Sequence, residues 1–396
     1  MSAQRDHRRI GRELRLFMFH EEAPGQAFWL PDGLRLRAAL LDWWRREHAA
    51  RGYREVLTPQ VYDAGLWERS GHMAKYREEM FLLPDGDRLL GLKPMNCPGH
   101  ILVAEQLLRS YRDLPLRLAE IGAVHRHESS GNRNGLLRAC VFSIDDAHIF
   151  CAPDAIRREI DECLSLAAQV YRTFDLEPQV ELSRRPVQRI GDDALWDAAE
   201  DALAAALEQH GIDHQVRDGE GAFYGPKIDL HLLDSAGRSW QLGTVQLDFT
   251  LGGRFGLAVA GSDGSPIRPV LLHRAMLGSL ERFVAILLEH TDGWLPGWLA
   301  PTQAVVLAVA DRHAGYASDV AAALAAAGAR AEAGERSQTL GAGIRDAVRR
   351  RVPHVLVVGD RELQERSVSV RRSGGSTSSQ PLDHAVRQIV AEVAAP

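Results

Sequence analysis

Cysteine is scarce in this chain, and long apolar runs are missing from it. None of its four cysteines forms a Cys-x-x-Cys pair; they are Cys97, Cys140, Cys151 and Cys163. Disulfide-stapled secreted domains are short and cysteine-rich, so we expect reduced thiols and a cytoplasmic protein. The polar, basic N-terminal segment is unlike a secretory signal. No apolar run reaches the roughly 18 residues that a membrane-spanning helix needs, so we expect no membrane partner.

An excess of positive charge is also lacking. The net charge of −6 argues against a nonspecific DNA binder, although a local basic face for RNA stays compatible with it. The hydrophobic content of 45% and the charged content of 25% are typical of a globular protein with a sizeable core. At roughly 150 residues per domain, the length predicts two or three domains.

The clearest domain boundary lies in the segment DGWLPGWLAPTQAVVLAVA. Two prolines and two glycines separate a helical run at 279–289 from a strand-like run at 304–310. We therefore predict a first domain over residues 1–298 and a second over residues 299–396. After the boundary, strand and helix patterns alternate, which predicts a small three-layer α/β domain.

The first domain shows a less regular pattern with hairpin-like connections. The segments LPLRLAEIGAVHRHE and LLRACVFSIDDAHIF predict two strands joined by the polar loop SSGNRNG. Such connections favour an antiparallel sheet, so the expected fold class is α+β. The glycine-rich GEGAFYGPK lacks the spacing of a P-loop, and no dinucleotide fingerprint is present.

Three residues raise the question of a metal site. Cys97 lies in LKPMNCPGH, where a thiol fits core packing, a metal ligand or a nucleophile. His148 and His273 follow at intervals of 51 and 125 residues, which is unlike local zinc-finger spacing. From spacing alone, core packing is the better interpretation for all three residues.

The two predicted hairpin strands carry further charged residues. Arg126 and Glu128 are predicted to lie on the first strand, where alternation puts them on one face. Alternation likewise puts Asp146 and His148 on one face of the second strand. An arginine so placed would bind a phosphate through two hydrogen bonds, and a glutamate would accept a hydrogen bond from the amino group of a base. The alternative is a plain cross-strand ion pair. Spacing alone favours the ion pair.

The order of the motifs changes this interpretation. An Arg-x-Glu strand, a loop and a strand with Phe, followed much later by Gly-x-x-x-Arg, resembles motifs 2 and 3 of class II aminoacyl-tRNA synthetases. Pro59, after the predicted long helix and a strand, fits motif 1. Within this class the chain is similar to the threonyl-tRNA synthetase family, through KPMNCPGH, SYRDLPLRLAE, DDAHIF, GEGAFYGPKI, QLGTVQLDF and HRAMLGSLERF. The resemblance runs from about Asp6 to the C-terminus.

The resemblance implies a class II antiparallel-sheet catalytic domain followed by an α/β anticodon-binding domain. It implies a homodimeric ligase that activates L-threonine with ATP and Mg²⁺ and transfers it to tRNA(Thr). One Zn²⁺ per subunit would select threonine through its amino group and hydroxyl, and valine would be rejected because it lacks the hydroxyl.

The resemblance also assigns roles by position. The implied metal ligands are Cys97, His148 and His273, and the implied catalytic residues are Arg126, Arg282 and His72. The implied ATP contacts are Arg126, Glu128, Arg138, Phe142, Gln241 and Arg282. The implied amino-acid contacts are Asp146, Tyr224, Gln246 and Met95. Lys93 and Lys227 would either add positive charge at the site or serve as surface or ion-pair residues.

Some features depart from the family pattern. The family usually carries two further N-terminal domains, one of which hydrolyses seryl-tRNA, so we expect no editing in cis here. Ile144 stands where the family has a glutamine close to the substrate, and Cys140 and Val141 replace an Arg-Gly pair. In the last domain, ERSQTLGAG differs from the family, and SVSVRRSGG only partly keeps the anticodon-contacting Arg-x-Arg.

These departures leave two other functions open. One is a paralogue that activates threonine or a related β-hydroxy amino acid for a non-translational acceptor, or that confers resistance to an inhibitor. The other is a catalytically silent tRNA-binding or regulatory protein. Retention of the two motif arginines and all three metal ligands argues against the silent protein.

Overall fold

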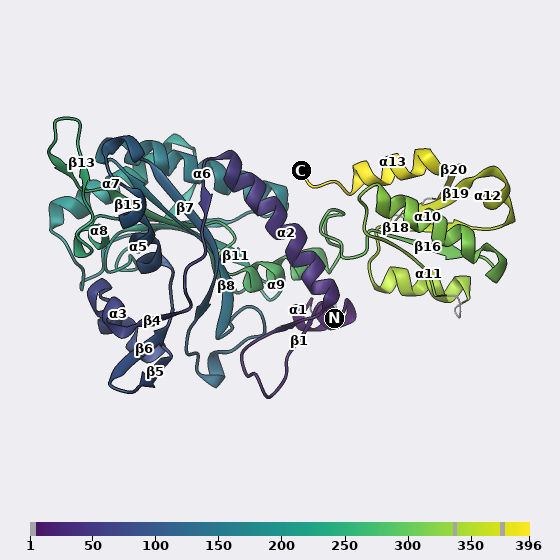
Figure 1. Cartoon of the computed structure of the whole chain (residues 1–396), viewed down its shortest axis with the longest axis horizontal. Helices are drawn as coiled ribbons and strands as arrows, with labels where there is room; N and C mark the ends of the chain where they lie inside the picture. The colour runs from purple at the N-terminus through teal and green to yellow at the C-terminus, as the bar shows by residue number, and fades with distance from the viewer. Residues whose placement is uncertain (1–4, 336–338, 373–376) are drawn as a thin grey trace. The chain divides into compact units, whose positions relative to one another are not determined.

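The computed structural model describes residues 5–335, 339–372 and 377–396 (Figure 1), and the chain divides into two compact units. The larger unit comprises Glu21–Gln26 and Arg45–Ile286, and the smaller unit Met1–His20, Ala27–Trp44 and Leu287–Pro396. The domain boundary after residue 298 stays a prediction. The unusual segments ERSQTLGAG and SVSVRRSGG include residues 336–338 and 373–375, which lie outside the described residues. Within the described chain, no helix combines the length and the apolar character needed to cross a bilayer.

The elements of the larger unit follow the chain in this order. Its strands are β3 (Arg54–Glu55), β4 (Val61–Asp63), β5 (Leu82–Asp85), β6 (Arg88–Leu92), β7 (Leu116–His125), β8 (Val141–Cys151), β9 (Gln179–Ser183), β10 (His214–Arg217), β11 (Lys227–Leu233), β12 (Ser239–Asp248), β13 (Val259–Ala260), β14 (Pro266–Ile267) and β15 (Val270–Ala275). Its helices are α3 (Ala64–Ser70), α4 (His72–Tyr76), α5 (Cys97–Leu107), α6 (Ile156–Thr173), α7 (Asp193–Gln209) and α8 (Leu251–Arg254).

Two helices contribute residues to both units, namely α2 (Pro31–Ala50) and α9 (Leu280–Thr291). The smaller unit also holds α1 (His7–Glu13), β1 (Phe17–Met18), β2 (Phe28–Trp29), β16 (Ala304–Ala308), α10 (Ala314–Ala326), β17 (Ala331–Ala333), α11 (Leu340–Arg349), β18 (His354–Val358), α12 (Asp360–Glu365), β19 (Ser367–Arg372), β20 (Thr377–Pro381) and α13 (Leu382–Glu392).

An eight-stranded sheet forms the centre of the larger unit, in the order β10-β9-β11-β12-β15-β8-β7-β3. Its neighbours run antiparallel, except for the parallel pairs at the two edges. β7 and β8 form the predicted hairpin, with Leu116 opposite Phe150 and His125 opposite Val141. The predicted α+β fold class is therefore confirmed.

The apolar pattern of α6 explains how this sheet is covered. Buried residues recur every three or four positions along the helix, at Ile160, Cys163, Leu164, Ala167, Val170 and Tyr171. This spacing puts them on one stripe, which packs against β8, β12 and β15. Because side chains alternate along β8, those of its even-numbered residues project from the opposite face of the sheet, where the candidate site lies.

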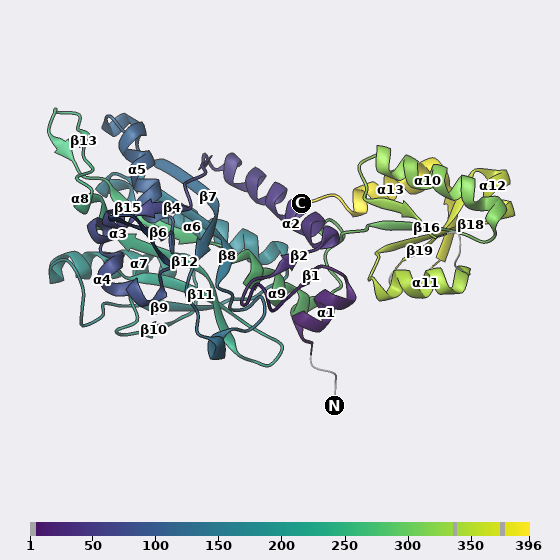
Figure 2. The same cartoon turned by 60° about the horizontal axis from the view of Figure 1, so that its bottom comes forward.

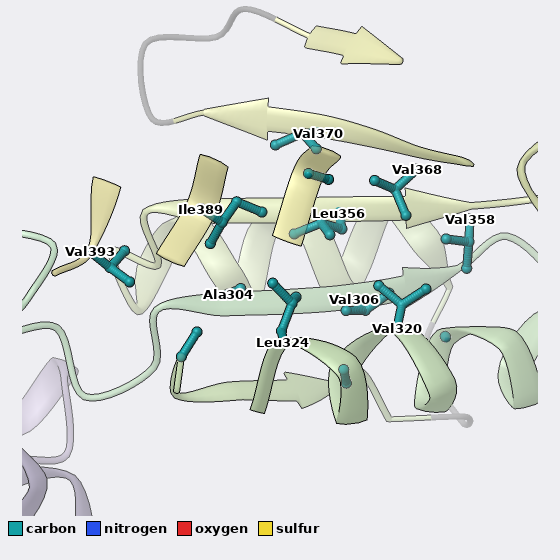
Figure 3. Close-up of a cluster of buried hydrophobic side chains, with 14 residues drawn as sticks. Ala304, Val306, Val320, Leu324, Leu356, Val358, Val368, Val370, Ile389 and Val393 are labelled. Carbon is teal, nitrogen blue, oxygen red and sulfur yellow. The ribbon is translucent and has the colours of Figure 1, made fainter. Parts of the chain in front are cut away.

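The smaller unit contains the predicted alternating layers. Its sheet has the order β17-β16-β18-β19-β20, and in Figure 2 α10 and α13 lie on one face while α11 lies on the other. Val306 of β16 packs with Leu324 and Ile389 in one apolar cluster (Figure 3), and its neighbours Val305 and Leu307 pack with α11. Both faces of β16 are buried, which is why its sequence reads as a continuous apolar run.

The alternating pattern does not predict every element of this unit. It omits α12 and the antiparallel strands β19 and β20. Val368 and Val370 of β19 are fully buried, but serines and arginines surround them in the sequence. β20 is the polar segment TSSQP, which carries no apolar signal at all.

Candidate active site and metal centre

A cavity of about 390 Å³ lies on the sheet of the larger unit. Side chains from β8, β11, β12, β15, the start of α5 and α9 line it. Predicted site residues that it gathers are Met95, Cys97, Arg126, Phe142, Asp146, His148, Tyr224, Gln241, Gln246, His273 and Arg282. His72, Glu128 and Arg138, three further predicted residues, stand outside this lining.

Cross-strand register builds one row of polar side chains in the cavity. His273 of β15 lies directly opposite His148 of β8, and Gln246 of β12 lies opposite His273. Lys227 of β11 continues the row opposite Gln246. Residues directly opposite one another on antiparallel strands project to the same face, so four strands present four polar groups side by side.

The predicted metal ligands converge at one end of this row. The sulfur of Cys97 and one ring nitrogen each of His148 and His273 all lie within 4.8 Å of one another, and all three residues are buried. Nε2 of His148 is 2.8 Å from Nδ1 of His273. Zinc holds sulfur at about 2.3 Å and nitrogen at about 2.0–2.1 Å, so its ligand atoms must converge to within a few ångströms. The three side chains therefore fit a zinc ion.

The surroundings of Cys97 have two opposite effects on cation binding, since burial disfavours its thiolate while nearby carboxylates attract a cation. Burial raises the pKa of its thiol well above the usual range, and the nearby carboxylates of Asp146 and Asp248 add to this effect. A coordinating divalent ion reverses this, because a thiol bound to such an ion is deprotonated. Three protein ligands leave a fourth position free for a substrate, as in catalytic zinc sites.

Polar groups surround the metal centre on the sheet. Burial raises the pKa of Asp146, whose Oδ2 accepts a hydrogen bond from Asn96 Nδ2 at 3.0 Å. The Tyr224 hydroxyl donates to Gln246 Oε1 at 2.6 Å, and its ring lies 5.1 Å from the ring of His273. These groups can bind a small ligand that carries both hydroxyl and amine functions.

Two arginines give the cavity positive charge. The guanidinium of Arg126 lies 5.4 Å from the ring centre of Phe142, within range of a cation–π contact. Arg282 on α9 donates to the backbone carbonyls of Leu137, at 2.8 Å, and Gln241, at 2.6 Å. Burial and the neighbouring charges of Arg126 and Arg138 lower the pKa of Arg282 to about 10, so it stays cationic at neutral pH. Partly buried positive charge of this kind suits a phosphate ligand.

The placement of Arg126 and Glu128 on a strand is wrong. β7 ends at His125. The amide of Arg126 still donates to the carbonyl of Cys140 at 2.8 Å, but that of His127 donates to the carbonyl of Glu79 at 2.7 Å. The chain therefore leaves the sheet, and Glu128 pairs with Arg138 at 2.9 Å across the hairpin. Glu128 thus forms the ion pair that spacing favoured, with Arg138 as its partner, whereas Arg126 lines the cavity.

His72 lies behind the metal centre. It is fully buried, and its Nε2 is 3.6 Å from the sulfur of Cys97, while its Nδ1 is 2.8 Å from Ser70 Oγ. Burial lowers the pKa of His72 to about 4, and the charge of His273 adds to this effect. The ring is therefore neutral at physiological pH.

The two lysines have different environments. Lys93 is fully buried, and its Nζ lies 2.9 Å from Glu120 Oε1, so the ion-pair alternative is correct for it. Lys227 lines the cavity and lies 2.5 Å from Asp229 Oδ2. Its positive charge is therefore present at the site, but shared with a carboxylate.

Sequence reasoning missed four polar residues next to the predicted ligands: Asn96, His100, Glu120 and Asp248. His100 follows Cys97 by three residues on α5, which is one helical turn and a usable signal. Asp248 ends β12 two residues after Gln246, on the same face by alternation. Glu120 lies opposite Asp146 in the β7–β8 register, which the sequence does not reveal.

The chain is similar to known proteins over nearly its whole length. Residues 76–291 match the model of the tRNA synthetase class II core domain (G, H, P, S and T), and residues 303–392 match that of the anticodon binding domain. The chain is 47% identical over 391 residues to a threonine–tRNA ligase of Natranaerobius thermophilus, covering 98% of this chain and 62% of that protein. It is 50% identical over 393 residues to one of Halorhodospira halophila, covering 99% and 61%.

A solved structure extends these similarities to the fold. It is that of the RNA binding domain of threonyl-tRNA synthetase from Cryptosporidium parvum, with a TM-score of 0.95 and 40% identity, covering 99% of both chains. The chain spans about three fifths of the length of the two curated relatives, at 62% and 61%.

Proposed function

We propose that this chain, which belongs to the threonyl-tRNA synthetase family of class II aminoacyl-tRNA synthetases, activates L-threonine with ATP and transfers it to tRNA(Thr). One observation carries the proposal. Cys97, His148 and His273 converge in the same cavity as Arg126 and Arg282. In the contacts described for them, these two arginines donate to backbone carbonyls rather than to carboxylates. A centre that recognises a hydroxyl and an amine thus adjoins a centre that recognises phosphates.

The amino acid would bind at the metal end of the cavity. Zinc held by Cys97, His148 and His273 would supply a Lewis-acidic position for the threonine amine and hydroxyl. Asp146 would accept hydrogen bonds from these groups, and Tyr224 and Gln246, which bond to each other, would close the polar side of the pocket, with Met95 at its wall.

ATP would bind at the arginine end with Mg²⁺. Arg126 would hold the α-phosphate and the threonine carboxylate, and Arg282 the terminal phosphates. A carboxylate oxygen then forms a bond to the α-phosphorus, and the bond to the leaving pyrophosphate breaks. Adenine would stack on Phe142 and donate to Glu128, with further ATP contacts from Arg138 and Gln241. The arginines stabilise the charge that develops on the phosphate oxygens.

The transfer step needs a proton acceptor near the terminal ribose of tRNA. His72 is neutral because of its burial, and it lies directly behind Cys97. We propose that it assists removal of the ribose hydroxyl proton, as the hydroxyl oxygen attacks the carbonyl carbon and AMP leaves.

Amino acid discrimination tests this proposal. We expect ATP–pyrophosphate exchange with threonine to exceed that with valine by about 10⁴-fold in kcat/KM, because a site built to bind a hydroxyl rejects an analogue that lacks it. Serine keeps the hydroxyl and loses one methyl, so we expect a loss of only about 10–200-fold. Valine activated as well as serine would contradict a metal-based selection of the hydroxyl.

A second candidate has one observation in its favour. Ile144 lines the cavity, and its apolar side chain offers no hydrogen bond to a ligand. This fits a paralogue that activates threonine or a related β-hydroxy amino acid for another acceptor, or one that resists an inhibitor. Charging of purified tRNA(Thr) with radiolabelled threonine separates the two: efficient charging supports the ligase, and exchange without charging supports the paralogue. Seryl-tRNA that accumulates when radiolabelled serine replaces threonine would support the expectation of no editing in cis.

We further propose a homodimer formed through the motif 1 region, in the cytoplasm. The expected result from light scattering on the purified chain is a mass of twice 43.8 kDa. A mass of 43.8 kDa at micromolar concentration would contradict the dimer.

A further inference from the structure

We infer that Asp248 and the pair His100–Glu120 are positioning residues, each fixing the tautomer of one imidazole ligand so that both rings aim a lone pair at the metal position. The inference rests on the proposed metal site, and it concerns residues to which neither spacing nor the family resemblance assigned a role. Its test is made through metal binding rather than through activity.

Asp248 fixes the ring of His273. Its Oδ2 lies 2.9 Å from Nε2 of His273, and Asp248 is fully buried. Its Oδ1 accepts from the amides of Thr250, at 2.7 Å, and Leu251, at 3.0 Å, at the start of α8. An ionised carboxylate only accepts hydrogen bonds, so Nε2 of His273 carries the proton. Nδ1 of His273 is then left with its lone pair toward His148.

His100 and Glu120 fix the ring of His148. Nδ1 of His148 lies 2.8 Å from Nδ1 of His100, and Nε2 of His100 lies 3.1 Å from Glu120 Oε2. Since Glu120 accepts, Nε2 of His100 carries a proton and Nδ1 of His100 is the acceptor. Nδ1 of His148 must therefore donate, and its Nε2 is left with a lone pair toward His273.

The two chains of hydrogen bonds meet at one point. They leave Nε2 of His148 and Nδ1 of His273 only 2.8 Å apart, each with a lone pair. The ring protons of His148 and His273 lie on the opposite nitrogens, where they are donated to His100 and Asp248. Neither ring can therefore donate a hydrogen bond to the other, and the two lone pairs repel unless a cation lies between them. Hydrogen bonds of this outer kind orient ligating histidines and raise their basicity.

The two chains differ in charge. Asp248 acts on His273 directly, whereas the charge of Glu120 is balanced by Lys93, whose Nζ lies 2.9 Å from Oε1. His273 is therefore the ligand whose ring receives more negative charge, and Asp248 should affect metal affinity more than Glu120 does.

Asp248→Asn is the most specific variant, because the asparagine oxygen can still accept from the amides of Thr250 and Leu251 at the start of α8. Its NH₂ group would face Nε2 of His273 and push the ring proton to Nδ1, where it blocks coordination. We expect the zinc dissociation constant, measured by competition with a chromophoric chelator, to rise about 10–100-fold. The visible spectrum of the cobalt form should change as well. The matched control is Asp234→Asn, a buried aspartate that accepts from Trp240 and Arg238 and should keep the parent's affinity.

A pair of variants at His100 tests the other chain. The Oδ1 of Asn can take the place of the accepting Nδ1, so His100→Asn should retain much of the zinc affinity that His100→Leu loses. Thermal unfolding of the metal-free forms separates this effect from loss of folding. If Asp248→Asn does not fold, the difference in zinc affinity between His100→Asn and His100→Leu still tests the inference.

Equal zinc affinities and cobalt spectra for parent, Asp248→Asn and His100→Leu would overturn the inference while leaving the metal site standing. A parent that binds no divalent ion would overturn both the inference and the proposed metal site.

Discussion

Replacing Cys97 with serine should reduce threonine-dependent ATP–pyrophosphate exchange to below about 1% of the parent rate, given that even outer partners of a metal ligand cost roughly 10–100-fold. The variant should also purify without stoichiometric zinc. The reason is that a serine hydroxyl is not ionised at neutral pH, so only the imidazoles of His148 and His273 remain as ligands. Metal analysis and the exchange assay on the same preparation measure both effects.

Cys151→Ser provides the matched control. Cys151 is also a fully buried free thiol on the same sheet, at the end of β8, and it takes no part in the metal cluster of the described residues. This variant should keep its zinc and its activity. Full activity of the zinc-free Cys97→Ser protein would show that the metal does not participate in threonine activation.

The second large effect is expected at Arg126. Arg126 lines the cavity, and its guanidinium lies 5.4 Å from the ring centre of Phe142. Replacement with methionine keeps the length of the side chain but removes its charge and donors. We expect kcat for threonyl-adenylate formation to fall by about 10²–10³-fold, the usual cost of removing one donor aimed at developing negative charge.

Two further variants show whether the effect is specific. Arg126→Lys keeps the charge but loses the planar fork, so its rate should lie between those of the parent and Arg126→Met. Arg217→Met removes an exposed arginine from β10 that pairs only at the surface with Glu181, at 2.8 Å, and should keep the parent's rate. A parental rate for Arg126→Met would contradict a role of Arg126 at the α-phosphate.

Much of the fold can be predicted from local patterns. The α6 stripe, the β7–β8 hairpin and the alternating elements from β16 to α11 each carry a single clear period of apolar residues. The predictable part of the site is also local: Asp146 and His148 share a face of β8 because they are two residues apart. β19 and β20 could not be predicted in this way, because polar residues make up most of both strands.

The metal centre depends on information that spacing does not contain. His148 and His273 become neighbours only through the register of β15 on β8, which pairs residues 125 positions apart. A second register, that of β7 on β8, places Glu120 opposite Asp146. The ligands were predicted because the motifs resemble a known family, whereas the contacts of Asp248 with His273 and of His100 with His148 are seen only in the packed structure.

The long separation of the three ligands has a consequence for how this protein matures and resists heat. α5, β8 and β15 must all be in place before a divalent ion finds three donors, so the proposed ion would be captured late in folding and would then act as a cross-link between distant parts of the chain. Such a cross-link stabilises only the folded form, by about 2.7 kcal/mol when the free ion is at 100 times its dissociation constant. The thermal stability of the larger unit would therefore depend on the supply of the metal, and a lack of the ion would lower both the stability of the fold and the activity.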